Sequence, residues 1–99
     1  MTKINYQFSK IYKLVSKKTG KIFIGSTTKK YLSSRKSQHL YEYRMFPVKR
    51  DKSKSFHVLK DEDIDIILIE KYPCNDKDEL HSRTMYWIDY IDCVNKEQV

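Results

Sequence analysis

The sequence is short of the residues that build linkers and cross-links. Its 99 residues include only two glycines, two prolines and two cysteines. So little glycine and proline excludes a long flexible linker, and we expect one domain over residues 1–99. Cys74 and Cys93 lie outside any CxxC motif and apart from histidine clusters. That arrangement favours free thiols in a reducing compartment over a disulfide or a zinc site.

Long apolar runs are also missing. No stretch approaches the about 18 residues of a membrane-spanning helix, and the first nine residues lack the apolar core of a signal peptide. We therefore expect an intracellular protein, cytoplasmic or nuclear, with no membrane partner. Hydrophobic residues still make up 39% of the chain, enough for a modest core beside 33% charged residues.

Acidic residues are scarce in the first part of the chain. Residues 1–60 carry 16 lysines and arginines against two acids, a net charge of +14, whereas residues 61–99 carry four against eleven, a net charge of −7. A basic face built from the first part would attract a polyanion such as nucleic acid, which releases counterions on binding. A solvated surface that keeps the protein in solution explains the same charge, so composition leaves both interpretations open.

Alternating apolar residues predict a β-hairpin around a turn at residues 17–20. Tyr12 and Leu14 share one face of the first strand, and Phe23 and Gly25 share one face of the second. The two aromatic rings can therefore lie near each other across the paired strands.

The remaining elements follow from periodicity and end signals. Residues 32–46 lack glycine and proline and precede a proline, which predicts a helix. Residues 64–69 predict a strand, more fully buried than the hairpin arms. Asp76 and Glu79 resemble a capping box that begins a last helix. The order strand, strand, helix, strand, helix predicts a compact α/β (α+β) domain.

Five short motifs occur in a fixed order over about residues 10–95. They are Lys10-Ile11-Tyr12, then Phe23-Ile24-Gly25 with Ser26-Thr27, then Arg35 and His39 four residues apart on one helix face, then ELHSRTMYWID at residues 79–89, and finally Asn95. In this order the chain resembles the GIY-YIG nuclease family. The resemblance implies a three-stranded antiparallel sheet flanked by helices and hydrolysis of a DNA phosphodiester with Mg²⁺ or Mn²⁺.

The resemblance also implies roles for four matching residues. In such enzymes a tyrosine activates the attacking water, an arginine stabilises the developing charge, and a glutamate on the last helix holds the cation. Tyr12 matches the first-motif tyrosine, Arg35 the helix arginine, His39 the helix histidine and Asn95 the terminal asparagine. A phosphodiester requires this combination of nucleophile and positive charge.

Two positions depart from the family pattern. Phe23 stands where the second motif has a tyrosine, and Thr84 stands where the last helix has its metal-binding glutamate. A neutral hydroxyl cannot replace the charge that holds Mg²⁺ against its hydration shell, so no metal ligand is predicted. We therefore expect catalysis to be weak or absent, through natural divergence or a change from glutamate.

Each candidate also has an ordinary structural interpretation. Tyr12 and Phe23 could be packing residues, Arg35 with His39 a solvated helix face, and Thr84 a small residue in the seam between helix and sheet. Asn95 could simply be the residue that ends the last helix. The whole domain could be a non-catalytic nucleic-acid-binding module or a protein-interaction domain. If DNA is the partner, its phosphates are expected to meet a group of basic residues, namely Lys29, Lys30, Lys36, Arg44, Lys49, Arg50, Lys52 and Lys54.

Overall fold

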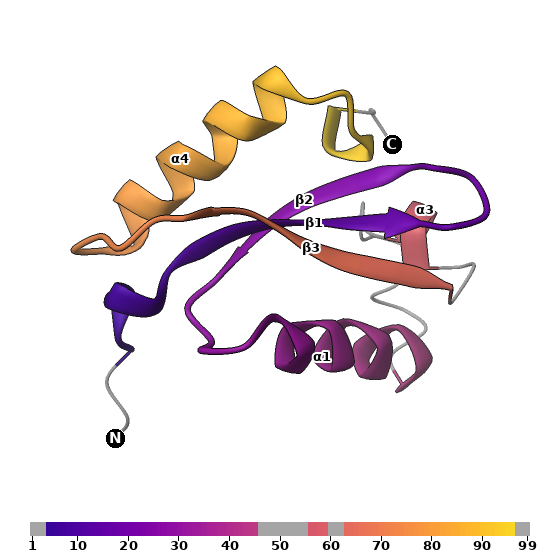
Figure 1. Cartoon of the computed structure of the whole chain (residues 1–99), viewed down its shortest axis with the longest axis horizontal. Helices are drawn as coiled ribbons and strands as arrows, with labels where there is room; N and C mark the ends of the chain where they lie inside the picture. The colour runs from indigo at the N-terminus through magenta and orange to yellow at the C-terminus, as the bar shows by residue number, and fades with distance from the viewer. Residues whose placement is uncertain (1–3, 46–55, 60–62, 97–99) are drawn as a thin grey trace.

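A computed structural model describes residues 4–45, 56–59 and 63–96 (Figure 1). The elements in chain order are the 3-10 turn η1 (Tyr6–Phe8), β1 (Lys10–Ser16), β2 (Ile22–Thr27), α1 (Leu32–Met45), the short α3 (Phe56–Leu59), β3 (Ile64–Lys71), α4 (Lys77–Tyr90) and the 3-10 turn η2 (Val94–Lys96). The predicted order of strands and long helices and the α+β class are confirmed. The predicted end of the first helix, residue 46, lies outside the described residues, and none of the described helices has the length and apolar character to cross a membrane.

The three strands form one antiparallel sheet in the order β2-β1-β3. The predicted hairpin is confirmed, and its turn closes where the Gly20 N–H donates to the Ser16 carbonyl at 2.8 Å. Gly20 has a φ of 75°, a left-handed conformation that glycine adopts without a steric cost. The register places Tyr12 opposite Gly25 and Leu14 opposite Phe23.

The prediction that the third strand is the most deeply buried is wrong. β3 lies at the edge of the sheet, and Ile67 and Leu68 are 43% and 41% exposed. β1 is the central strand, and its residues Ile11, Tyr12 and Leu14 are fully buried because strands flank it on both sides. An unbroken apolar run shows that a strand contacts other elements, but it does not show where in the sheet the strand lies.

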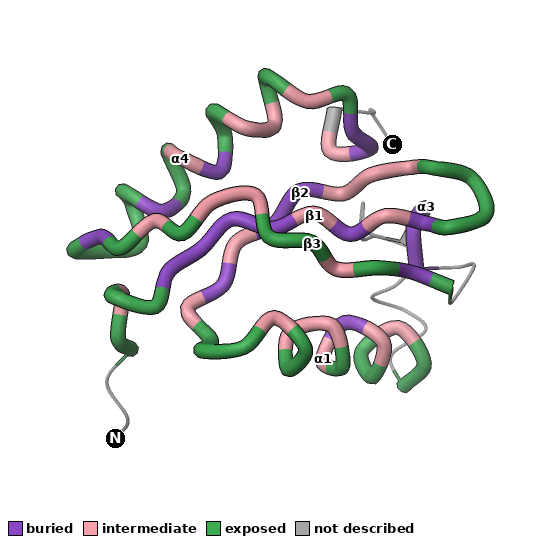
Figure 2. The backbone as a smooth tube through the Cα atoms, in the orientation of Figure 1, coloured by how far each residue is buried: buried purple, intermediate pink, exposed green. Residues whose placement is uncertain are grey.

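The two long helices cover opposite faces of the sheet (Figure 1). On one face, Tyr12 and Leu14 pack with Leu40 and Tyr43 of α1. On the other face, apolar residues of β1 and β2 pack with α4, and the members include Ile11, Ile24, Leu80, Trp87 and Ile88. Buried residues therefore concentrate along β1 between the two helices, as the burial colouring shows (Figure 2).

The start of α4 confirms half of the predicted capping box. The carboxylate of Asp76 accepts the backbone N–H of Glu79 at 3.0 Å, which satisfies one free donor of the first turn. The carboxylate of Glu79 accepts the backbone N–H of Asn75, also at 3.0 Å, instead of the N–H of Asp76. The return bond thus reaches one residue further back than in the standard box.

Tyr12 lies across the neighbouring strand at Gly25. A Cβ atom on Gly25 would lie 2.6 Å from the Tyr12 hydroxyl oxygen and 2.7 Å from the ring carbon that carries it. Such distances are far inside van der Waals contact, so only glycine leaves room for the ring. The glycine of the second motif therefore has a packing role that the register explains.

We expect the substitution Gly25→Ala to lower the free energy of unfolding by about 1–3 kcal/mol, because the added methyl overpacks the site of the Tyr12 ring. Urea unfolding followed by circular dichroism measures the effect. Ser26→Ala is the matched control, since it changes the next residue of the same strand without adding an atom. Equal stability of Gly25→Ala and the parent chain would contradict the close approach of ring and backbone.

Candidate functional site

Three of the candidate residues meet on the face of the sheet that α1 covers. The Tyr12 hydroxyl oxygen lies 2.7 Å from Nε2 of His39 and 3.1 Å from Nε of Arg35. Tyr12 comes from the central strand, whereas Arg35 and His39 come from successive turns of α1, where a spacing of four residues keeps them on one face. We call these three residues the Tyr12 group.

The hydrogen-bonding capacity of each side chain assigns the direction of these bonds. A guanidinium can only donate, so Arg35 donates its Nε–H to the Tyr12 oxygen. The hydroxyl can then donate its own proton to Nε2 of His39, in the neutral tautomer that carries its hydrogen on Nδ1. The tyrosine oxygen is thereby held between a cation and a base.

Burial determines the charge state of this group. His39 is 6% exposed, and burial, with a smaller contribution from the Arg35 charge, lowers its pKa from 6.5 to about 4. The imidazole is therefore neutral at pH 7. Burial raises the pKa of Tyr12, although the nearby Arg35 opposes this change, so the phenol keeps its proton.

Arg35 is also held from its other side. Its Nη1 donates to Oε1 of Gln38 at 2.9 Å, and Nε2 of Gln38 donates to Oε1 of Glu42 at 3.3 Å. This line of side chains runs from the buried tyrosine to the exposed end of Glu42. Sequence reasoning missed Gln38, although its position three residues after Arg35 places it on the same helix face.

Phe23 packs beside the Tyr12 group without any polar contribution. Its ring meets the His39 ring edge-on, with a centroid distance of 6.1 Å and an interplanar angle of 77°. The ring also joins the apolar cluster that contains Tyr12 and Leu14. Phe23 therefore helps to exclude water from His39 but supplies no hydroxyl.

Thr84 lies in the other layer of the molecule. It is 8% exposed on the buried face of α4, one turn after Leu80, and its hydroxyl donates to the Leu80 carbonyl at 2.8 Å. No hydrogen bond joins it to the Tyr12 group in the described part of the chain. The structure thus brings Tyr12, Arg35, His39 and Phe23 together and leaves Thr84 apart.

The described residues do not fit Mg²⁺ or Mn²⁺ at position 84. A hard cation takes carboxylate and carbonyl oxygens, whereas Thr84 is uncharged and its hydroxyl is occupied by a carbonyl of its own helix. Glu70 of β3 is already engaged, because both its carboxylate oxygens accept hydrogen bonds from Arg83 at 2.6 and 2.9 Å. Residues 4–45, 56–59 and 63–96 contain no cluster of three or more histidine, cysteine or acidic ligands.

Asn95 is bound to the backbone of the edge strand β2. Its Oδ1 accepts the Ile24 N–H at 2.8 Å, and its Nδ2 donates to the Ile24 carbonyl at 2.9 Å. The side-chain amide therefore satisfies both backbone groups of the residue next to Gly25, as a neighbouring strand would. Asn95 contributes by positioning β2 and lies 71 residues from Ile24 in the sequence.

The candidate phosphate-binding residues are only partly described. Lys29 and Lys30 are exposed just before α1, Lys36 is half-buried on α1, and Arg44 is exposed in its last turn. The other four, Lys49, Arg50, Lys52 and Lys54, lie outside the described residues. The described members all lie on α1, which carries Arg35, or just before it.

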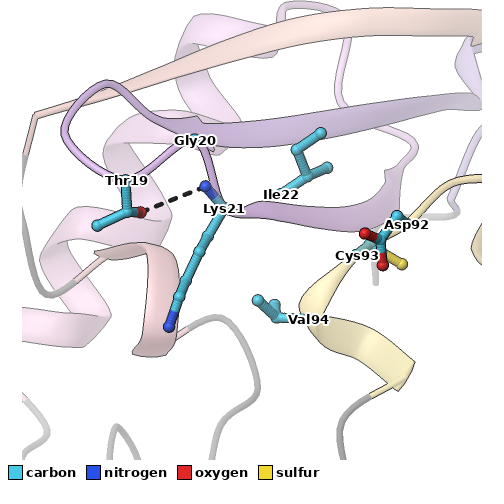
Figure 3. A pocket seen from close by; sticks show the side chains of 7 residues that line it. All are labelled: Thr19, Gly20, Lys21, Ile22, Asp92, Cys93 and Val94. Carbon is cyan, nitrogen blue, oxygen red and sulfur yellow. Dashed lines mark hydrogen bonds between the residues drawn. The ribbon is translucent and has the colours of Figure 1, made fainter.

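A hollow of about 340 Å³ lies between the hairpin turn and the chain after α4. Its lining residues are Thr19, Gly20, Lys21, Ile22, Asp92, Cys93 and Val94 (Figure 3). The Thr19 hydroxyl accepts the backbone N–H of Lys21 at 3.2 Å, so this part of the wall belongs to the turn itself. None of the candidate site residues that the structure describes lines this hollow.

Comparison with known proteins identifies no relative. Neither a protein-family model, nor a curated protein, nor a solved structure matches this chain. The order of the motifs and the geometry of the Tyr12 group are therefore the features that point to a function.

The depressed pKa of His39 predicts a pH-dependent stability. Between pH 6.5 and about 4 the unfolded chain binds a proton at His39 that the folded chain does not, so the free energy of unfolding falls as the pH drops through this window. The loss is on the order of 3 kcal/mol and is absent at pH 7. Urea unfolding at pH 7, 5.5 and 4 measures it, and His39→Gln serves as the control without a titrating ring. The hypothesis fails if the parent chain and His39→Gln lose stability equally over this range.

Proposed function

We propose that the chain is a GIY-YIG endonuclease-family domain that binds DNA at the Tyr12 group and hydrolyses it weakly or not at all. The observation that carries this proposal is the meeting of Tyr12, Arg35 and His39 within hydrogen-bonding distance. These residues were selected from motifs up to 27 residues apart, and a solvated helix face would not bury a histidine against a strand tyrosine.

The hydrogen bonds of the Tyr12 group suit proton transfer from water. When the Tyr12 oxygen takes a proton from an attacking water, its own proton can pass to Nε2 of the neutral His39. Arg35 donates a hydrogen bond to the same oxygen, and its guanidinium can stabilise negative charge that develops on a phosphate. Tyr12 is fully buried, so a phosphate meets the half-buried Arg35 first and would replace Gln38 as the partner of Nη1.

The metal-binding part of the family mechanism has no counterpart at position 84. A bound divalent cation would supply charge for the departing oxygen, but the Thr84 hydroxyl is committed to the Leu80 carbonyl. Hydrolysis by this chain is therefore expected to be slow, whereas phosphate binding by Arg35 and the neighbouring lysines needs no cation. The same observation favours a non-catalytic nucleic-acid-binding module as the second candidate function.

DNA binding is the first test of the proposal. We expect a labelled duplex to bind at low salt and the affinity to fall steeply as KCl rises from about 50 to 200 mM, because each phosphate contact releases counterions. Arg35→Ala should bind more weakly than Lys18→Ala, which removes the same charge from the exposed hairpin turn. Fluorescence anisotropy measures the affinities, and circular dichroism checks that Arg35→Ala is folded. Absence of binding at low salt would remove both nucleic-acid functions and favour a protein-interaction domain.

Plasmid nicking with Mg²⁺ or Mn²⁺ separates the catalytic from the non-catalytic hypothesis. We expect little nicking by the chain as it stands, a gain in Thr84→Glu, and no gain in Thr84→Gln, which has the same size without the charge. Adding Arg35→Ala to Thr84→Glu should abolish the gain. Strong metal-dependent nicking by the unmodified chain would show that another carboxylate holds the ion, and equal nicking by the Glu and Gln variants would show that position 84 is not the metal site.

A further inference from the structure

A pocket of about 350 Å³ lies just before the N-terminal end of α1. Pockets that bind small ligands start at roughly 300 Å³, so its volume suits a ligand of modest size. The pocket is formed where η1, the start of β1, the end of β3 and the turn before α1 meet. Its lining residues are Gln7, Phe8, Ser9, Lys10, Lys30, Tyr31, Lys71 and Pro73, which we call the lysine pocket.

The lysine pocket concentrates positive charge that the described structure does not neutralise. Three of its lining residues are lysines and none is acidic. Lys10 is 7% exposed, and its ammonium donates to the backbone carbonyls of Phe8, Lys29 and Lys30 at 2.6, 2.5 and 3.4 Å. Among the described residues, no ion pair joins Lys10, Lys30 or Lys71 to a carboxylate. The Lys10 ammonium thus has carbonyl acceptors for its three donors, while the exposed Lys30 and Lys71 keep theirs for an anionic ligand.

Burial and the neighbouring Lys71 both lower the pKa of Lys10, which reflects this excess of positive charge. The N-terminal end of α1 adds further positive charge near the pocket. α1 is 14 residues long and has no acidic residue in its first turn, so the positive end of its dipole faces this region without local compensation.

Exposed aromatic rings accompany the lysines. Tyr31 is 61% exposed and Phe8 is 42% exposed, although both line the pocket. The Lys30 ammonium lies 5.6 Å from the centroid of the Tyr31 ring. A flat exposed ring beside a cation can hold a nucleotide, because the base stacks on the ring while the phosphate pairs with the ammonium. A ligand such as inorganic phosphate would leave the two rings unused.

We propose that the lysine pocket holds one nucleotide unit, with its base on Tyr31 and its phosphate on Lys30 and Lys71. This inference rests on the proposed function, because the nucleotide in the lysine pocket would be the neighbour of the one whose phosphate binds at the Tyr12 group. Lys10 and Tyr12 lie on the same face of β1, two residues or about 7 Å apart, and Tyr31 directly precedes α1, whose first turn contains Arg35. One strand of nucleic acid can therefore reach both places.

Binding of a short oligo-dT strand to the full chain tests this inference. We expect Tyr31→Ala to weaken binding roughly five- to a hundredfold, the range for loss of one stacked base, while Tyr31→Phe binds as the parent chain does. Lys71→Ala should lower the slope of log affinity against log salt by about 0.7, the value for one lost phosphate contact on a single strand. Lys18→Ala is the control for loss of charge elsewhere, and Lys10 is left intact because its ammonium donates to three backbone carbonyls.

The outcomes separate this inference from the proposed function. If duplex DNA binds through Arg35 but Tyr31→Ala behaves like Lys18→Ala, the pocket is not a nucleotide site and the proposed function stands. If Arg35→Ala has no effect while Tyr31→Ala abolishes oligo-dT binding, the pocket stands and the proposed function fails.

Thymidine monophosphate and inorganic phosphate identify the source of the ligand. If thymidine monophosphate binds saturably and its binding depends on Tyr31, the pocket takes a free nucleotide. If oligo-dT binds and thymidine monophosphate does not, the pocket takes a strand. Either result supports the proposal. Competition by inorganic phosphate as strong as that by thymidine monophosphate would overturn the role of the base.

Discussion

The position of the Tyr12 ring against Gly25 is the constraint on which this site depends. The ring belongs to the central strand and crosses the edge strand β2. A Cβ atom on Gly25 would lie 2.6 Å from the Tyr12 hydroxyl oxygen. A buried phenol requires hydrogen-bonding partners, because an unsatisfied polar group inside a protein costs free energy. His39 and Arg35 of α1 are the hydrogen-bonding partners of the Tyr12 hydroxyl. The position of the ring therefore also constrains how α1 packs on the sheet.

The same burial that orders the site sets its chemistry. A histidine in water would be partly protonated near neutrality, whereas His39 is neutral because it is enclosed and faces the Arg35 charge. A neutral imidazole can accept the tyrosine proton, and a protonated one could not. Charge and shape are thus coupled at this site, since opening it to water would change both its geometry and the proton affinity of its base.

The uneven charge of the sequence recurs in the two long helices, since α1 contains three basic residues and one acid whereas α4 contains two basic residues and three acids. Basic residues flank α1 and the lysine pocket, on the face of the sheet that holds the Tyr12 group. The acidic second part of the chain supplies α4 on the opposite face, where Glu70 pairs with Arg83 and Arg83 lies 4.4 Å from the Tyr86 ring centroid.

Sequence alone determined the elements and the residues worth testing. The hairpin, the two long helices and their order follow from period-two and period-3.6 patterns, which are local properties, and the i, i+4 spacing placed Arg35 and His39 together. Tertiary structure decided the rest, because strand order, burial and contacts between distant segments depend on how elements pack. It moved β3 to the sheet edge, bound Asn95 to Ile24, and directed Thr84 into a different layer from Tyr12. The lysine pocket likewise gathers residues 7 to 73, a juxtaposition that no local pattern encodes.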